Sequence, residues 1–187
     1  MKDSRILLRD VEWSTYVKLR DVPDDSHLRM TYLQGELEIM SPGKRHEVTA
    51  KQIARLLELF CQIRRIRLFG FRQMTQRAKR RKRGLEPDEC YARGRDKARP
   101  DIAIEVVVSS PLLDKLDVYR GLGIREVWVF ENGSFTIHRL RGDRYTAITA
   151  SKVFPEIDLN RIAHYATLPD QPQALFDYEA ELRRKRR

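Results

Sequence analysis

The chain has 187 residues, a formal net charge of +10 and two cysteines, Cys61 and Cys90, which form no CxxC pair. This length is typical of one domain whose core needs no disulfide, and the cysteine pattern excludes a disulfide scaffold and a zinc site. The charged N-terminus and the short apolar runs exclude a signal peptide and a membrane span, so we expect a cytoplasmic protein without membrane partners. We expect a single domain over residues 1–187, with a core at about 28–150 and C-terminal helices at about 158–187.

The excess positive charge is concentrated in two runs, Lys79–Arg83 and Arg183–Arg187, which contain no acidic residue. The chain has 37 Lys and Arg residues, and ten of them lie in these two runs. The other 27 basic residues equal the 27 acidic residues in number, so the rest of the chain is neutral. Clustered cations attract a phosphate backbone through counterion release. The residues that we predict to contact nucleic acid are Lys79, Arg80, Arg81, Lys82 and Arg83, whereas the C-terminal run is more simply interpreted as a solvated tail.

The first third of the chain predicts, in order, a short helix over Asp10–Arg20, a hairpin of 28–32 and 36–40, and a long helix over His46–Ile63. Alternation of apolar and polar residues around Gln34-Gly35 indicates the hairpin. In the long helix, Ala50, Ile53 and Leu57 recur with helical spacing and mark a buried stripe.

The middle of the chain predicts, in order, a strand over Ile66–Met74, a basic loop over Arg77–Gly84, a strand that begins near Asp88, and a strand over Ile102–Val108. The last of these, IAIEVVV, is a nearly continuous β-branched run. Such a run is typical of a central strand that is covered on both faces.

The last third predicts helices over Pro111–Leu122, Leu159–Ala166 and Gln171–Arg184, strands over Glu126–Glu131 and Phe135–Leu140, and an edge strand over Arg144–Ile148. Proline suits the first position of a helix, and Asn132-Gly133 suits a hairpin turn. The strand–helix–strand order over 102–130 predicts a crossover between neighbouring parallel strands. We therefore predict an α/β (α+β) fold in which a central mixed sheet is flanked by helices, with an N-terminal helix and hairpin.

Glu105 is the most informative single residue, because it lies in the middle of the apolar run IAIEVVV. An ionised carboxylate buried in a strand is costly unless it is paired or binds a metal. Glu105 is therefore either a metal ligand or the structural partner of a cation such as Arg72. The sequence leaves both interpretations open.

Three further residues complete a candidate site: Asp88 at the start of a strand, Glu47 in the first turn of the long helix, and Lys115 on the helix after the buried strand. Two acids on neighbouring strands can hold Mg²⁺ or Mn²⁺ through oxygen ligands. A third acid can orient a water molecule, and a lysine can stabilise developing negative charge. Each residue alone has an ordinary structural explanation, since helix N-termini favour acids and Pro-Asp often begins a turn.

The spacing of Pro87-Asp88 and Glu105 resembles that of the PD-(D/E)XK nuclease superfamily. More specifically, Glu36–Leu140 is similar to a branch of predicted endonucleases that is greatly expanded in cyanobacteria. The similar segments are GELEIMSP with His46-Glu47 after it, GLEPDECY, RPDIAIEVVVSS and DKLDVYRGLGIREVWVFENG. The resemblance implies a restriction-endonuclease-like core, a Mg²⁺- or Mn²⁺-dependent nuclease, a homodimer, and Glu47, Asp88 and Glu105 as the acids.

Two features depart from the superfamily pattern. The lysine expected two residues after the glutamate is replaced by Val107, and the resemblance implies that Lys115 takes its place. A second Pro-Asp pair contains Asp101, but this residue lies about 13 Å from Glu105 along the same strand at ~3.3 Å per residue. Asp88 is therefore the better partner for Glu105, with Asp88 and Glu105 as the predicted metal ligands.

The function predicted from the sequence is a metal-dependent endonuclease that hydrolyses phosphodiester bonds of DNA by attack of an activated water. The alternatives are a non-catalytic DNA-binding module of the same fold, and a nuclease that acts on RNA or on structured DNA. The chain contains no P-loop and no dinucleotide-binding fingerprint, which excludes those nucleotide-binding classes.

Overall fold

The computed structural model describes residues 3–22, 28–71 and 76–184, which form two β-sheets and five α-helices. The larger sheet has six strands in the order β11-β10-β9-β8-β7-β4. These strands are β4 (Leu68–Gly70), β7 (Glu89–Arg93), β8 (Ile102–Val107), β9 (Glu126–Glu131), β10 (Ser134–Arg141) and β11 (Arg144–Ile148). Only β8 and β9 pair in parallel, with α3 (Lys115–Leu122) between them, so the predicted crossover and mixed sheet are confirmed.

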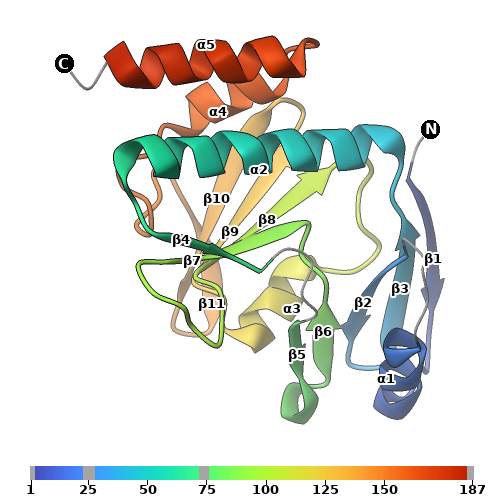
Figure 1. Cartoon of the computed structure of the whole chain (residues 1–187). Coiled ribbons are helices and arrows are strands. Elements are labelled where there is room, and N and C mark those ends of the chain that lie inside the picture. Colours follow the sequence, from blue (N-terminus) through green and yellow to red (C-terminus); the bar gives the residue numbers. More distant parts are fainter. Residues whose placement is uncertain (1–2, 23–27, 72–75, 185–187) are drawn as a thin grey trace.

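Three helices cover one face of this sheet (Figure 1): α2 (Lys44–Arg64), α4 (Leu159–Ala166) and α5 (Gln171–Arg184). The apolar stripe of α2 packs on the side chains that β8 and β9 direct to this face, among them Ile104 and Trp128. Helices α4 and α5 add Ile162 and Tyr178 to the same core. None of the described helices is long and apolar enough to cross a membrane.

The opposite face of the six-stranded sheet carries α3 and a second, smaller core. Val118 and Tyr119 of α3 pack there against Ala103 of β8 and Val127 of β9. Successive residues of a strand point to opposite faces, so β8 is covered on both sides, as its β-branched sequence predicts. Glu105 shares its face with Ala103 and therefore points toward α3.

A second sheet of five strands lies beside α3 (Figure 1), in the order β1-β3-β2-β6-β5. Its strands are β1 (Ser4–Leu8), β2 (Arg29–Leu33), β3 (Glu36–Ser41), β5 (Gln76–Ala78) and β6 (Arg83–Leu85). Helix α1 (Trp13–Asp21) packs on it through Tyr16, which stacks on Tyr32 with ring centroids 5.0 Å apart. The predicted hairpin is confirmed as β2 and β3.

The structure corrects four details of the sequence analysis. The N-terminal strand β1 was not predicted, and the predicted basic loop is instead a hairpin of β5 and β6 joined by a short 3-10 turn, η1 (Lys79–Arg81). Helix α3 begins at Lys115 rather than at Pro111, because the Asp114 side chain caps it by accepting a hydrogen bond of 3.1 Å from the Asp117 amide. The strand predicted over Ile66–Met74 is shorter, and residues 72–75 of it lie outside the described residues.

Glu126 is fully buried at the start of β9 and ties the segment before α4 to the sheet. Its carboxylate accepts hydrogen bonds from Ser151 Oγ at 2.6 Å, from the Lys152 amide at 2.8 Å and from Arg139 at 3.1 Å. Each of these donors would be left without its acceptor if the carboxylate were removed, and an unsatisfied buried donor is costly.

We predict that Glu126→Ala lowers the free energy of unfolding by about 3–5 kcal/mol, as expected when one partner of a buried ionic network is removed. Chemical denaturation of the variant measures this. The matched control is Glu131→Ala, which removes an exposed carboxylate from the other end of the same strand. Equal stabilities of the two variants would show that Glu126 does not hold this segment.

Candidate active site

Asp88 directly precedes β7, and Glu105 lies on the neighbouring strand β8, at the junction of the two sheets. β7 and β8 are antiparallel with Glu89 opposite Ile104, so one more step of this register brings Asp88 opposite Glu105. The Val106 amide donates a hydrogen bond of 2.6 Å to Asp88 Oδ2. Both acids are buried, with 1% and 2% of their surface exposed. The structure therefore brings together the two acids that the sequence predicts as metal ligands.

Glu105 is held by two side chains of α3, each reaching one carboxylate oxygen. Lys115 Nζ lies 2.6 Å from Oε2, and the Tyr119 hydroxyl donates a hydrogen bond to Oε1. Burial, and then the negative charge of Glu105, raise the pKa of Tyr119 well above its usual value, so this phenol remains a donor. Arg72, the partner considered from the sequence, lies outside the described residues. The cation on Glu105 is the predicted Lys115.

Asp88 is held from the other side by Arg29 of β2 and by His46 of α2. The Arg29 guanidinium contacts Asp88 Oδ1 and lies 2.6 Å from Glu47 Oε1, so one buried cation joins two of the predicted acids. The Glu47 side chain is 46% exposed. Glu47 thus reaches the site through Arg29 at its solvent edge.

His46 is buried between two carboxylates. Its Nε2 lies 2.9 Å from Asp88 Oδ1, and its Nδ1 lies 3.5 Å from Asp3 Oδ2. Burial, followed by the positive charge of Arg29, lowers the pKa of His46, although the charge of Asp3 opposes the shift. Because an ionised carboxylate only accepts hydrogen bonds, Nε2 donates to Asp88.

Asp3 directly precedes β1 and holds the start of α2 in place. Burial disfavours its charge, but the Gly43 amide at 2.9 Å, His46 and Ser109 outweigh burial, so that the pKa of Asp3 is lowered. The carboxylate thereby fixes the turn from which α2 begins. His46 and Glu47 follow directly on that turn.

A buried acid of the second sheet fixes the segment that leads to Lys115. Glu38 of β3 accepts a hydrogen bond of 3.3 Å from the Leu113 amide, another from the Leu112 amide, and one of 2.6 Å from Arg5. The backbone before α3 is therefore held by a carboxylate that is 2% exposed. This contact explains how Lys115, on a different element, is directed at Glu105.

The basic run Lys79–Arg83 is divided by the fold. Arg83 is buried, and its guanidinium lies 2.7 Å from Asp117 of α3. The side chains of Lys79, Arg80, Arg81 and Lys82 remain exposed. Arg83 therefore has a structural role in holding the hairpin to α3, and the contact of these five residues with nucleic acid stays a prediction.

Several residues of the site were not predicted. Arg29, His46 and Tyr119 each hold one of the predicted acids, and Asp3 and Glu38 hold the elements that carry them. His46 stands beside Glu47 in one of the segments that resemble the endonuclease branch, which was the one signal in the sequence. By contrast, Asp101 is a structural acid, since it accepts from the Arg93 amide at 2.9 Å and pairs with Lys97.

Among the described residues, no group of three or more His, Cys, Asp and Glu side chains is arranged to hold a metal ion. The two facing acids each already contact a cationic side chain, Arg29 or Lys115. The metal ligands therefore remain predictions at this point.

Comparison with known proteins identifies one matching family. The model of the Uma2 family, described as "Putative restriction endonuclease", matches residues 13–166, and no curated protein matches the chain. The match spans α1 to the end of α4 and includes Asp88, Glu105, Glu47 and Lys115. Because it covers well over half of the chain, the protein belongs to the Uma2 family, within the PD-(D/E)XK restriction-endonuclease-like superfamily.

Proposed function

We propose that the protein is a Mg²⁺- or Mn²⁺-dependent endonuclease that hydrolyses phosphodiester bonds of DNA. The observation that carries this proposal is a pair of buried carboxylates, Asp88 at the start of β7 and Glu105 on the neighbouring β8, with Lys115 Nζ 2.6 Å from Glu105. Membership of a restriction-endonuclease family supports nuclease activity and DNA as the substrate. A homodimer and a cytoplasmic location remain predictions.

The donor set fits a hard divalent cation. Mg²⁺ is commonly bound by only one or two carboxylates, with waters and substrate phosphates as the other ligands, so a third protein acid is not required. Asp88 and Glu105 would hold it. Both carboxylates already contact positively charged groups, Arg29 and Lys115, which shows that this location favours positive charge.

A divalent ion at such a site lowers the pKa of a water and neutralises charge on the phosphoryl oxygens. The side chains of the chain supply the remaining functions. Lys115 can stabilise the negative charge that develops on the scissile phosphate, because its ammonium is held next to Glu105 and is 16% exposed. Glu47, at the solvent edge, can orient the attacking water. His46 positions Asp88 through the hydrogen bond from Nε2.

The position of Lys115 supports the interpretation that the lysine of the superfamily has moved. Glu105 and Val107 are two residues apart on β8 and share a face of the sheet, but Val107 carries no charge. Lys115 brings an ammonium group to Glu105 from the next helix. The alternative is a DNA-binding module without catalysis, in which the two acids serve only to pair with Arg29 and Lys115.

Cleavage of a supercoiled plasmid tests the proposal. We predict that the protein nicks or linearises the plasmid with Mg²⁺ or Mn²⁺ but not with a chelator, and that Asp88→Asn and Glu105→Gln each abolish cleavage, because each removes ligand charge while keeping the side-chain shape. Asp96→Asn is the matched control, since Asp96 is exposed in the connection between β7 and β8. If the wild type binds the plasmid without metal-dependent cleavage, the non-catalytic alternative is correct.

We predict that Lys115→Ala lowers the single-turnover cleavage rate far more than it weakens DNA binding, because a group that stabilises transition-state charge contributes little to ground-state affinity. Rapid-quench kinetics and equilibrium binding measure the two effects. Lys44→Ala, an exposed lysine in the first turn of α2, serves as the control. A loss of affinity with an unchanged single-turnover rate would assign Lys115 to phosphate contact.

We predict that Glu105 and Lys115 stabilise the metal-free protein as a pair. Glu105→Gln leaves a largely buried ammonium without its counter-charge and lowers the free energy of unfolding, whereas the double variant Glu105→Gln/Lys115→Met loses less than the sum of the single variants. The coupling free energy, measured by denaturation in chelator, should be about 1–3 kcal/mol. Strict additivity would contradict the ion pair.

A further inference from the structure

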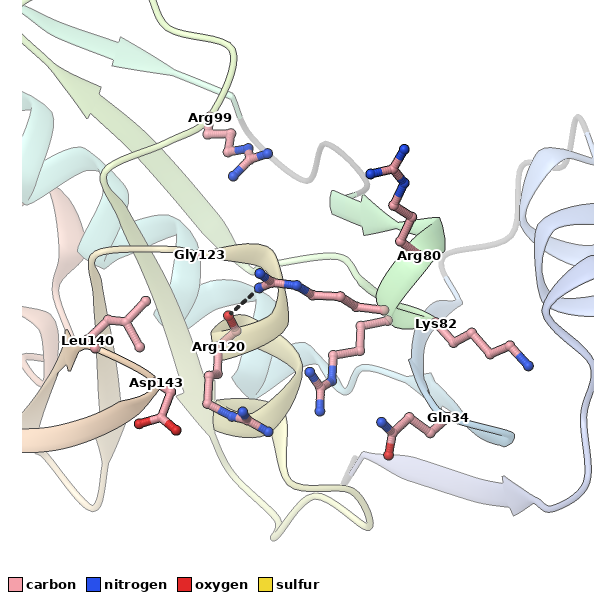
Figure 2. Close-up of a pocket in the computed structure, with 11 residues that line it drawn as sticks. Gln34, Arg80, Lys82, Arg99, Arg120, Gly123, Leu140 and Asp143 are labelled. Atoms are coloured by element: carbon pink, nitrogen blue, oxygen red, sulfur yellow. Dashed lines mark hydrogen bonds between the residues drawn. The ribbon is translucent and has the colours of Figure 1, made fainter.

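A hollow of ≈ 600 Å³ lies at the end of α3 that is remote from Lys115 (Figure 2). Its walls come from five segments: the β2–β3 turn, the β5–β6 hairpin, the connection between β7 and β8, the C-terminal end of α3, and the end of β10 with the turn to β11. Six of its lining residues are basic: Arg80, Arg81, Lys82, Arg83, Arg99 and Arg120. A single acid, Asp143, lines it. We call it the basic hollow.

The hairpin that carries most of these cations is fixed against α3. Arg81 donates a hydrogen bond of 2.9 Å to the Gly121 carbonyl, and the Gln34 amide donates one of 3.0 Å to the Lys82 carbonyl. A Cβ on Gly121 would lie 2.1 Å from Arg83 Cδ, so the helix needs glycine where the Arg83 side chain crosses it. The backbone that presents the cations is thus held in place before any ligand binds, which reduces the entropic cost of binding.

Not all of these cations are equivalent. Arg83 and Arg120 share Asp117, with Arg120 Nε 2.8 Å from its Oδ1. Arg80, Lys82 and Arg99 are exposed and form no ion pair with any residue that the structure describes. Figure 2 shows Arg80 and Lys82 extending from the hairpin and Arg99 from the β7–β8 connection. Within the described part of the chain, three cations from two segments therefore border the hollow without an ion-pair partner.

We propose that the basic hollow binds a backbone phosphate of duplex DNA, at a site separate from the pair of acids. A phosphodiester is the ligand class that fits this lining. The bordering cations have no ion-pair partner among the described residues, and arginine donates planar bidentate hydrogen bonds to phosphate. Leu140 is the only large apolar side chain in the lining. The proposal adds two residues from outside both basic runs, Arg99 and Arg120, to the DNA-binding surface. The identity of the ligand as DNA rests on the proposed function.

Helix α3 sets the spacing between the two sites. Lys115 begins the helix at Glu105, and Gly123, the residue after its last turn, lines the hollow. Eight residues at ~1.5 Å per residue span about 12 Å. The hollow thus positions the duplex and does not take part in the chemistry.

Salt-dependent binding of a labelled DNA duplex, measured in chelator so that no cleavage occurs, tests the proposal. The variant Arg80→Ser/Arg99→Ser removes two cations of the hollow. Its matched control is Lys51→Ser/Arg95→Ser, which removes the same charge from exposed residues that lie outside the lining and outside the basic run. Circular dichroism and melting temperature establish that both variants are folded.

We expect the hollow variant to flatten the dependence of log K on log salt by about 0.9 for each lost phosphate contact, while the control variant stays near the wild-type slope. Equal slopes of the two variants would overturn the proposal, because the effect would then be one of net charge alone. Inorganic phosphate, added at constant ionic strength, should not displace the duplex. Displacement at low phosphate concentration would overturn it in favour of a site for a free anion.

Failure of this proposal can be distinguished from failure of the proposed nuclease function. A wild type that binds DNA with the expected slope change in the hollow variant, but never cleaves, would refute the nuclease and leave the hollow intact. A wild type that cleaves with metal, together with an unchanged slope in the hollow variant, would refute the hollow alone.

Discussion

The burial of a carboxylate in the central strand is the constraint on which the rest of this structure depends. Glu105 stands in a strand that is covered on both faces, where an unpaired charge would oppose folding by several kcal/mol. The fold meets this constraint with α3, which supplies Lys115 to one oxygen and Tyr119 to the other. Helix α3 must therefore begin at the C-terminal end of β8 and run back along the sheet, as the parallel crossover requires.

The second sheet serves the same purpose for Asp88. Arg29 of β2 reaches across to Asp88 and Glu47, and Glu38 of β3 holds the segment that precedes α3. The small sheet is thus the framework that supplies charges to the larger one. Each of the two acids thus has a cationic partner, so the metal ion that we propose would have to compete with Arg29 and Lys115 or displace them.

Helix α3 also connects the proposed catalytic site to the proposed DNA-binding hollow. Its first residue contacts Glu105, its middle residue Asp117 pairs with Arg83, and the glycines at its end support the basic hollow. One short helix therefore sets the distance between the two sites. The β5–β6 hairpin is tied to this helix by side chains of the basic run itself, so part of that run is structural.

Much of the fold follows from the sequence. The elements from β8 to α5 and the β2–β3 hairpin were predicted because strong local signals mark them: a β-branched run, Asn132-Gly133, and apolar residues at helical spacing. The pairing of Asp88 with Glu105 was predicted too, through the motif that the endonuclease branch shares. Strand β1 and the β5–β6 hairpin were missed, because the half-buried face of β1 carries Arg5 and the hairpin consists largely of cations, so that neither shows the apolar alternation of a half-buried strand.

What the sequence determined by itself is which acids stand in costly positions, since the cost of burying Glu105 is evident from its apolar neighbours. Only the tertiary structure decided what accompanies those acids. Arg29, His46 and Tyr119 come from three elements distant in the chain, and a cation in a sequence carries no sign of the carboxylate that it will meet. The same holds for the basic run: local composition gives its charge, but the contact of Arg83 with Asp117 divides it into structural and exposed cations, because this ion pair joins two elements that are distant in the chain.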